Sequence, residues 1–265
     1  MEADGRPSKK AKLSDFRKNV YSQCGEDGII EKIFETIGTT SKLCVEFGAW
    51  DGFHLSNTAA LWTKNWKGIL LEANPARYQK LVENVKRYPC LAIQAKVGSD
   101  ETSRIESILG NHGIHEPIDL LSMDIDGNDY YVFQSLRTLR PRVIICEYNP
   151  TIPAHIDVYP EPDNYFGCSV AALMRVAKSK GYQLAALTDV NAFFVHEDEF
   201  DKLAEFETAL EQIRIDDYLT YLITSYSGEY VCISSNKRLP YGCRKPYRKQ
   251  LNGRFHRPIR KFNIE

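Results

Sequence analysis

Acidic side chains recur at the ends of short apolar segments, and this repetition is the first sign of chemistry in the sequence. The four acids are Glu46, Glu72, Asp124 and Glu147. If the apolar segments are parallel strands, their carboxyl ends meet at one edge of a sheet, where ligands of open α/β sheets bind. Carboxylates accept hydrogen bonds from hydroxyl groups, bind cations and take up protons. The pattern therefore predicts one site built from several strand ends.

The turn after the first of these segments reads Glu46-x-Gly48-x-x-x-Gly52. Glycines allow a chain to turn sharply after a strand and let a ligand approach the backbone. A dinucleotide-binding turn has a glycine at the position of Glu46, and an acid there would repel a pyrophosphate. The acid suits a ligand with a cationic end, and S-adenosylmethionine carries a sulfonium and an ammonium group. The alternative is a tight strand-to-helix turn that binds no ligand.

The second acid lies at an informative distance from this turn. Glu72 follows Gly48 by 24 residues (72 minus 48). In nucleotide-binding α/β folds, an acid at about this interval accepts hydrogen bonds from the ribose hydroxyls. A polar loop over 98–103 follows the third apolar segment, and Ser99 or Asp100 could contact an adenine edge there. A simple surface turn is the alternative for that loop.

Two further segment ends carry four oxygen-bearing side chains. Asp124 and Asp126 follow one segment, and Glu147 and Asn149 follow the next. Hard oxygen ligands of this kind suit Mg²⁺ or Ca²⁺. The alternative is that these carboxylates cap helices and hydrogen-bond a cofactor.

A long segment over 151–167 contains prolines and aromatic residues. Because a loop of that length is usually functional, we interpret it as a lid or a wall of the substrate site. Four histidines are candidate bases, although an isolated histidine is more often a surface or packing residue. His155 has the best position, inside the predicted lid; the others are His54, His112 and His115.

Strand-like and helix-like patterns alternate along most of the chain, and two strand-like segments adjoin near residue 190. Such alternation predicts a doubly wound, mainly parallel α/β sheet with helices on both faces, and the adjoining pair adds an antiparallel strand. Seven strands are expected, over 43–45, 67–72, 91–97, 118–123, 141–147, 182–188 and 192–196.

The expected domain organisation is a single domain over 15–200 with an addition at each end. Residues 1–14 have little to bury and are expected to be disordered. A helix is expected over 200–213, and 201–265 form a helical and basic C-terminal extension. Residues 237–265 contain ten Lys or Arg against one acid, so this end is strongly basic.

The basic end interleaves its charges with tyrosines and phenylalanines. Positive charge with stacking rings suits nucleic acid or another anionic partner. The alternative is a tail that folds back on the acidic body of the chain.

Hydropathy and cysteine usage indicate in which cellular compartment the protein is expected. The sequence has 265 residues, no run of 18 apolar residues and no apolar leader, so we expect no membrane span and no secretory signal. The seven cysteines are scattered and form no C-x-x-C, which favours a reduced intracellular compartment. Lys9-Lys10-Ala11-Lys12 matches a short nuclear-import pattern, so a nuclear location is an alternative to the cytoplasm; a solvated basic tail is the simpler interpretation.

With these residues in place, the sequence resembles the class I S-adenosylmethionine-dependent methyltransferases, and within them the FkbM-like family. The resemblance runs in order from residue 22 to about 196. It rests on SQCGEDGII, VEFGAWDG, LLEANP, MDIDGNDY, ICEYNP and DVNAFFV. It implies a Rossmann-like methyltransferase fold and S-adenosylmethionine as cofactor. Trp50 and Phe53 are bulkier than the residues usual in the family at the first turn.

The resemblance also implies roles for individual residues. The methionine end of the cofactor would be held by the first turn and the loop before it, through Gln23, Glu26, Glu46, Gly48 and Asp51, with Gly52 also at the cofactor. Glu72 would accept hydrogen bonds from the ribose hydroxyls, with Asn74 beside it. Ser99 would lie near the adenine, and Asp124 would face the methyl group. The expected catalytic residues are Asp124, Glu147 and His155. A divalent cation such as Mg²⁺ would take Asp124, Asp126, Glu147 and Asn149, which resemble the carboxylate and amide ligands of the catechol O-methyltransferase type.

We therefore expect methyl transfer to a hydroxyl oxygen of a small molecule, a sugar or a nucleic-acid ribose, with metal assistance as an option. A binding module that has kept the fold but lost catalysis is one alternative. A metal-dependent hydrolase that uses Asp124, Asp126 and Glu147 is another, although it leaves Glu46 and Glu72 without a role.

Overall fold

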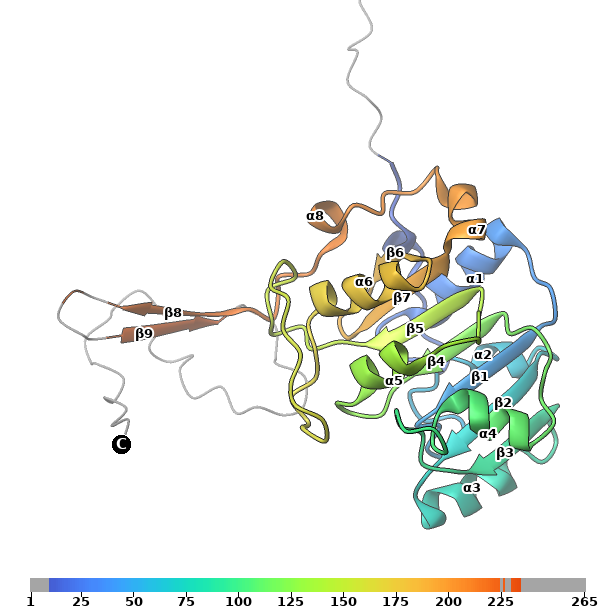
Figure 1. Cartoon of the computed structure of the whole chain (residues 1–265). Coiled ribbons are helices and arrows are strands. Elements are labelled where there is room, and N and C mark those ends of the chain that lie inside the picture. Colours follow the sequence, from blue (N-terminus) through green and yellow to red (C-terminus); the bar gives the residue numbers. More distant parts are fainter. Residues whose placement is uncertain (1–9, 225, 227–229, 235–265) are drawn as a thin grey trace, which may run out of the picture.

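A seven-stranded sheet forms the centre of the chain in the computed structural model, which describes residues 10–224, 226 and 230–234 (Figure 1). The strand order is β3-β2-β1-β4-β5-β7-β6, and β7 runs antiparallel to both of its neighbours. The order reverses between β1 and β4, so a crevice opens there. The strands are β1 (Leu43–Phe47), β2 (Lys67–Glu72), β3 (Cys90–Gln94), β4 (Leu120–Met123), β5 (Val143–Glu147), β6 (Tyr182–Leu187) and β7 (Asn191–His196).

The central strands are mostly apolar and are buried on both sides because helices cover both faces of the sheet. All five residues of β1 are buried, and Val45 lies in register between Ile69 of β2 and Leu121 of β4. One face packs against α4 (Ile105–Asn111), α5 (Asp129–Ser135) and α6 (Val170–Ser179). The other packs against α1 (Glu26–Ile37), α2 (Ala59–Trp62) and α3 (Pro75–Val85). The predicted doubly wound α/β fold is thus confirmed.

Local signals explain where the helices begin. The side chain of Asn74 accepts hydrogen bonds from the backbone N–H groups of Ala76 and Arg77, and Pro75 takes the first helical position of α3. Ser169 caps α6 through a hydrogen bond from Ala172 N. These caps set the direction in which each helix leaves its strand.

The predicted helix over 200–213 is wrong, because the segment is broken into short pieces. It contains the end of α7 (Glu197–Phe200), a 3-10 turn over Asp201–Leu203 and α8 (Leu210–Ile213). Between them Phe206 forms a parallel bridge with Ala11, and Glu207 N donates to Ala11 O at 2.7 Å. An extended backbone that pairs with another segment cannot also be helical.

The same contact corrects the expectation of disorder over 1–14. Leu13 is only 1% exposed and begins a 3-10 turn (Leu13–Phe16), and the Lys10 ammonium donates to Ala204 O. Residues 10–14 therefore pack on the domain, whereas 1–9 lie outside the described residues, including Lys9 of the basic import pattern. Lys12 in that pattern donates to Gln212 O.

Beyond α8 the chain forms a two-stranded hairpin that was not among the expected strands. It consists of β8 (Thr220–Thr224) and β9 (Tyr230–Ser234), and it projects from the domain (Figure 1). The basic segment 237–265, for which nucleic-acid contact is predicted, lies outside the described residues. No helix within the described residues is long and apolar enough to cross a membrane.

Candidate active site

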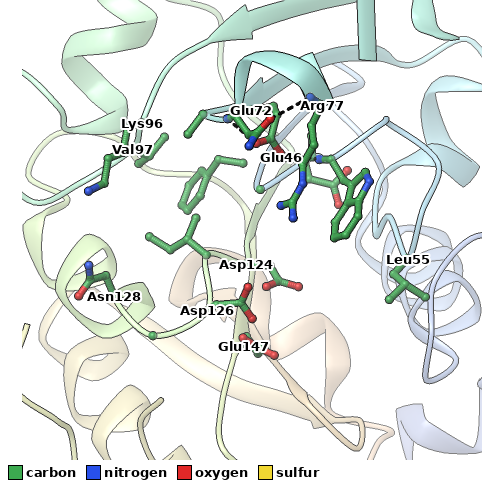
Figure 2. A pocket seen from close by; sticks show the side chains of 18 of the residues that line it. Glu46, Leu55, Glu72, Arg77, Lys96, Val97, Asp124, Asp126, Asn128 and Glu147 are labelled. Carbon is green, nitrogen blue, oxygen red and sulfur yellow. Dashed lines mark hydrogen bonds between the residues drawn. The ribbon is translucent and has the colours of Figure 1, made fainter. Parts of the chain in front are cut away.

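A cavity of about 590 Å³ opens at the carboxyl ends of β1, β2, β4 and β5, where the strand order reverses (Figure 2). Its wall includes the turns after β1 and β2 and the residues that follow β3 and β4. Glu147 at the end of β5 and the tip of the loop between β5 and α6 complete it. Concave sites at such a switch point are where doubly wound sheets bind ligands.

Glu46 near the end of β1 lines the cavity, and its carboxylate accepts hydrogen bonds from the residues that lead into α2. It accepts hydrogen bonds from Ser56 Oγ at 2.6 Å, from Thr58 Oγ1 at 2.7 Å and from Asn57 N at 2.8 Å. Burial raises the pKa of this carboxyl, and the three hydrogen bonds oppose that rise. The acid therefore fixes the shape of the β1 turn.

Glu72 at the end of β2 organises the same turn from the other side. Its carboxylate accepts hydrogen bonds from Trp50 N at 2.9 Å and from Asn74 N at 2.7 Å. Trp50 has a φ of 48°, in the left-handed region that favours glycine, so Glu72 stabilises a strained backbone. The Trp50 side chain lies on the cavity wall, and the Arg77 guanidinium carbon sits 3.7 Å from the centre of its ring.

Three carboxylates converge at the floor of the cavity. Asp124, Asp126 and Glu147 each offer an oxygen within 4.8 Å of the others, and Figure 2 shows these side chains facing one another. Burial raises the pKa of Asp124 well above its ordinary value, and the negative charges of Glu147 and other nearby acids raise it further. A cation at this point would relieve the repulsion, and three hard oxygens fit Mg²⁺ or Ca²⁺.

The turn that carries Asp126 is held by the first residue of α5. The carboxylate of Asp129 accepts hydrogen bonds from Ile125 N at 3.0 Å and from Gly127 N at 3.1 Å. Asp126 has a φ of 58° and Gly127 a φ of 132°, so the turn has an unusual backbone that Asp129 stabilises.

Glu26, predicted to contact the cofactor, is not part of the cavity wall. It is fully buried and accepts hydrogen bonds from Thr188 Oγ1 at 2.6 Å, from Asn191 Nδ2 at 3.1 Å and from Cys24 N at 2.7 Å. It therefore fastens the loop before α1 to the β6–β7 connection. That loop delivers Gln23, which does line the cavity.

Asp51 and Gly52, also predicted to contact the cofactor, serve the packing of the turn. The Asp51 carboxylate accepts hydrogen bonds from Phe53 N and His54 N, and Gly52 packs against α3. Gly48 lines the cavity and has a φ of 78°, and a Cβ on it would lie 1.8 Å from the backbone oxygen of Asp124. Only glycine allows this contact between the β1 turn and the end of β4.

Three other predicted residues lie away from the wall. Asn149 accepts hydrogen bonds from Thr151 N and Oγ1, and its amide donates to Phe166 O, so it folds the following loop rather than joining the acidic floor. Ser99 and His155 are exposed and do not line the cavity. The carboxyl end of a strand predicts a general location, but not the direction of the next side chains.

The cavity brings together nine of the predicted residues: Gln23, Glu46, Gly48, His54, Glu72, Asn74, Asp124, Asp126 and Glu147. Sequence reasoning missed several wall residues, notably Trp50 and Leu55 in the first turn, Arg77 in the first turn of α3, Lys96 and Val97 after β3, and Tyr165 in the long loop. The rule that strand ends meet at one edge could have found Lys96 and Val97.

Comparison with known proteins connects this site to one family. Residues 99–184 match the family described as the Methyltransferase FkbM domain. The match runs from the loop after β3 into β6 and contains Asp124 and Glu147. The family resemblance inferred from the sequence motifs is thus confirmed for this segment. No curated protein matches the chain significantly by sequence.

Solved structures with a similar fold are distant in sequence. An O-methyltransferase from Bacillus cereus in complex with SAH has 16% identity and a TM-score of 0.45, with 67% of this chain and 84% of that chain covered. Cofactor-bound Rv0187 from MTB has 16% identity and a TM-score of 0.44, with 70% and 86% covered. A tRNA (uracil-54, C5)-methyltransferase from Pyrococcus abyssi in complex with S-adenosyl-L-homocysteine has 12% identity and a TM-score of 0.38. That match covers 63% of this chain and only 36% of that chain.

Proposed function

We propose that this FkbM-type methyltransferase domain transfers the methyl group of S-adenosylmethionine to a hydroxyl oxygen of its acceptor. The observation that carries the proposal is the convergence of Asp124, Asp126 and Glu147 at the floor of the cavity. Such a floor favours a cationic ligand and offers bases for a hydroxyl proton. The floor lies in the same cavity as Glu72, which stands where an adenosine ribose would be held.

The residues around the turn after β2 would position the cofactor. Glu72 uses its oxygens for Trp50 N and Asn74 N, and a carboxylate has lone pairs for ribose hydroxyls as well. Val97 and Lys96 follow β3 and would border the adenine. The sulfonium would then lie toward Asp124, whose negative surroundings suit a positive charge.

The reaction is an in-line displacement at the methyl carbon. The bond from sulfur to the methyl group breaks as the bond from the acceptor oxygen forms, and S-adenosylhomocysteine leaves as a neutral thioether. The acceptor hydroxyl loses its proton to a carboxylate of the floor. Asp124 is the best placed of the three because burial and its neighbours raise its pKa and so increase its basicity.

A divalent cation fits the same floor. Asp124, Asp126 and Glu147 would hold it, and a bound cation would lower the pKa of the acceptor hydroxyl. Asn149 is not expected to be a ligand, because its side chain is engaged within the loop that follows β5.

Calorimetry with S-adenosylhomocysteine tests the cofactor half of the proposal. Wild type should bind, and Glu72→Ala should weaken binding by at least about tenfold because ribose contacts are lost. Glu101→Ala, an exposed acid in the loop after β3, is the matched control and should bind normally. No binding by wild type would refute the proposed function.

Transfer of a labelled methyl group to a fractionated cell extract, with and without EDTA, tests the catalytic half. Asp124→Asn should bind S-adenosylhomocysteine and yet lose transfer. Loss with EDTA and recovery with Mg²⁺ would support the metal. Cofactor binding without transfer to any fraction would instead support a silent binding module.

A further inference from the structure

Large apolar side chains surround the mouth of the cavity on two walls. Trp50 and Leu55 come from the turn after β1 and are 39% and 45% exposed, and Tyr165 comes from the loop between β5 and α6 and is 86% exposed. Single exposed apolar residues are ordinary on protein surfaces. Three that border one cavity form a surface that a ligand would cover.

The backbone around Tyr165 is fixed despite the exposure of its ring. Asp163 N donates to Asn128 Oδ1 at 2.8 Å, and Asn128 Nδ2 donates back to Asp163 Oδ1 at 2.9 Å. A Cβ on Gly127 would lie 2.7 Å from Asn164 O and 3.2 Å from the Cα of Tyr165. The loop tip therefore rests directly on the turn that carries Asp126.

The apolar residues of the β1 turn lie across the cavity from this loop tip. Figure 2 shows Leu55 and Asn128 on opposite sides of the three carboxylates, and Asn128 is the residue that pairs with the loop tip. A flat group that enters the mouth would have Tyr165 on one side and the Trp50–Leu55 wall on the other. Its inner end would reach the acidic floor.

We propose that the acceptor carries a planar aromatic ring, which lies between Tyr165 and the Trp50–Leu55 wall and presents a neutral hydroxyl to the floor. This inference rests on the proposed function and names its substrate class. Aromatic rings stack favourably on aromatic side chains, whereas a ring with a hydroxyl on every carbon needs polar partners that these three side chains supply poorly. The floor carries Asp124, Asp126 and Glu147, so a phosphate or carboxylate beside the reacting hydroxyl would be repelled.

Matched ring compounds test the inference on the full chain saturated with S-adenosylhomocysteine. The probes are 2-naphthol and decahydro-2-naphthol, which share the carbon skeleton and the hydroxyl but differ in planarity. Ligand-observed NMR titration gives the two dissociation constants without requiring turnover. Because the saturated compound is also apolar, a preference for 2-naphthol excludes general hydrophobicity. The phenolic hydroxyl is also the stronger hydrogen-bond donor, so loss of the preference in Tyr165→Ala is the result that identifies stacking.

Variants of the loop tip complete the experiment. Wild type should bind 2-naphthol about tenfold more tightly than the saturated compound, Tyr165→Ala should abolish that preference, and Tyr165→Phe should keep it. Phe166→Ala is the matched control, because Phe166 is 55% exposed but does not line the cavity, and it should behave as wild type.

Two results would overturn the inference while leaving the proposed function standing: equal affinity for the two probes, or an unchanged preference in Tyr165→Ala. Both apply when S-adenosylhomocysteine binds normally in the calorimetric experiment. Absence of S-adenosylhomocysteine binding would overturn the proposed function and this inference together.

Discussion

Glu46 offers a test of whether the acid of the first turn contacts the cofactor or builds the turn. Its carboxylate accepts three hydrogen bonds, from Ser56, Asn57 and Thr58, and the side chain is 5% exposed. Hydrogen bonds to a charged acceptor contribute about 1.5–3 kcal/mol each, but freed hydroxyls can rotate to other acceptors. We therefore expect Glu46→Ala to lower the free energy of unfolding by about 2–4 kcal/mol.

Glu46→Gln should behave differently because an amide can satisfy the same partners. Its oxygen can accept from Asn57 N, and its amide can donate to the hydroxyls of Ser56 and Thr58, which also act as acceptors. The free energy of unfolding should stay within about 1 kcal/mol of wild type near neutral pH. If Glu46 builds the turn, affinity for S-adenosylhomocysteine should also change little.

The pH dependence of the difference gives an independent check. Burial raises the pKa of Glu46 in the folded state above its ordinary value of 4.5, so the folded state binds more protons than the unfolded state over the window above 4.5. Stability contributed by this group is present below that window and is lost as pH rises through the folded pKa. Urea unfolding across pH 4–8 should therefore show the free energy of unfolding of Glu46→Gln rising relative to that of wild type as pH rises, by up to about 1.4 kcal/mol per pH unit.

One result would refute this account of Glu46. If Glu46→Gln kept its stability but lost at least tenfold in affinity for S-adenosylhomocysteine, the carboxylate would contact the cationic end of the ligand directly. A flat stability difference across the pH series would independently refute the raised pKa.

Three further predictions concern parts of the chain outside the cavity. Asp27→Asn should weaken S-adenosylhomocysteine binding several-fold by calorimetry, because Asp27 Oδ2 accepts three backbone hydrogen bonds in the loop that delivers Gln23. Arg142→Met should lower the free energy of unfolding by about 3–5 kcal/mol in urea titrations and leave cofactor affinity unchanged. It leaves buried Asp119 with its hydrogen bonds from Thr40 and Lys42 but without its ion pair, at the edge of the sheet opposite the cavity. Deletion of 237–265 should abolish any salt-sensitive RNA binding in filter assays while methyl transfer to a small acceptor persists; RNA binding that survives the deletion would refute the predicted role of the basic tail.

The fold was predictable because its signals are local and repeated. Apolar strands that end in acids, capped helices and two adjoining strands near residue 190 specify a doubly wound sheet, and these elements appear close to their expected bounds. The broken helix after Phe200 was not predictable, because Ala11 lies almost two hundred residues from the Phe206 it pairs with, and no local pattern reports such a contact. The β8–β9 hairpin was missed although its signals are local: both strands are rich in β-branched and aromatic residues, and the dipeptide Ser227-Gly228, typical of turns, stands between them in the sequence.

The site was predictable in location but only partly in membership. Strand ends must meet, so Glu72, Asp124 and Glu147 reach one cavity. Which side chains after a strand point inward depends on the backbone of the turn. The left-handed backbone of Trp50 is one example, and nothing in its residue type announced it. Glu26 also shows that a polar motif can serve a site by fastening the loop that carries another residue, here Gln23.

The acids at the strand ends therefore fall into two groups that residue type and spacing could not separate. Glu46 and Glu72 accept hydrogen bonds from the turn and helix start around them, so their charge is used to shape the cavity. Asp124, Asp126 and Glu147 instead bring their oxygens within 4.8 Å of one another. Like charges held this close are unfavourable unless a proton or a cation lies among them. The first group thus builds the cavity, and the second is the part of it best suited to chemistry.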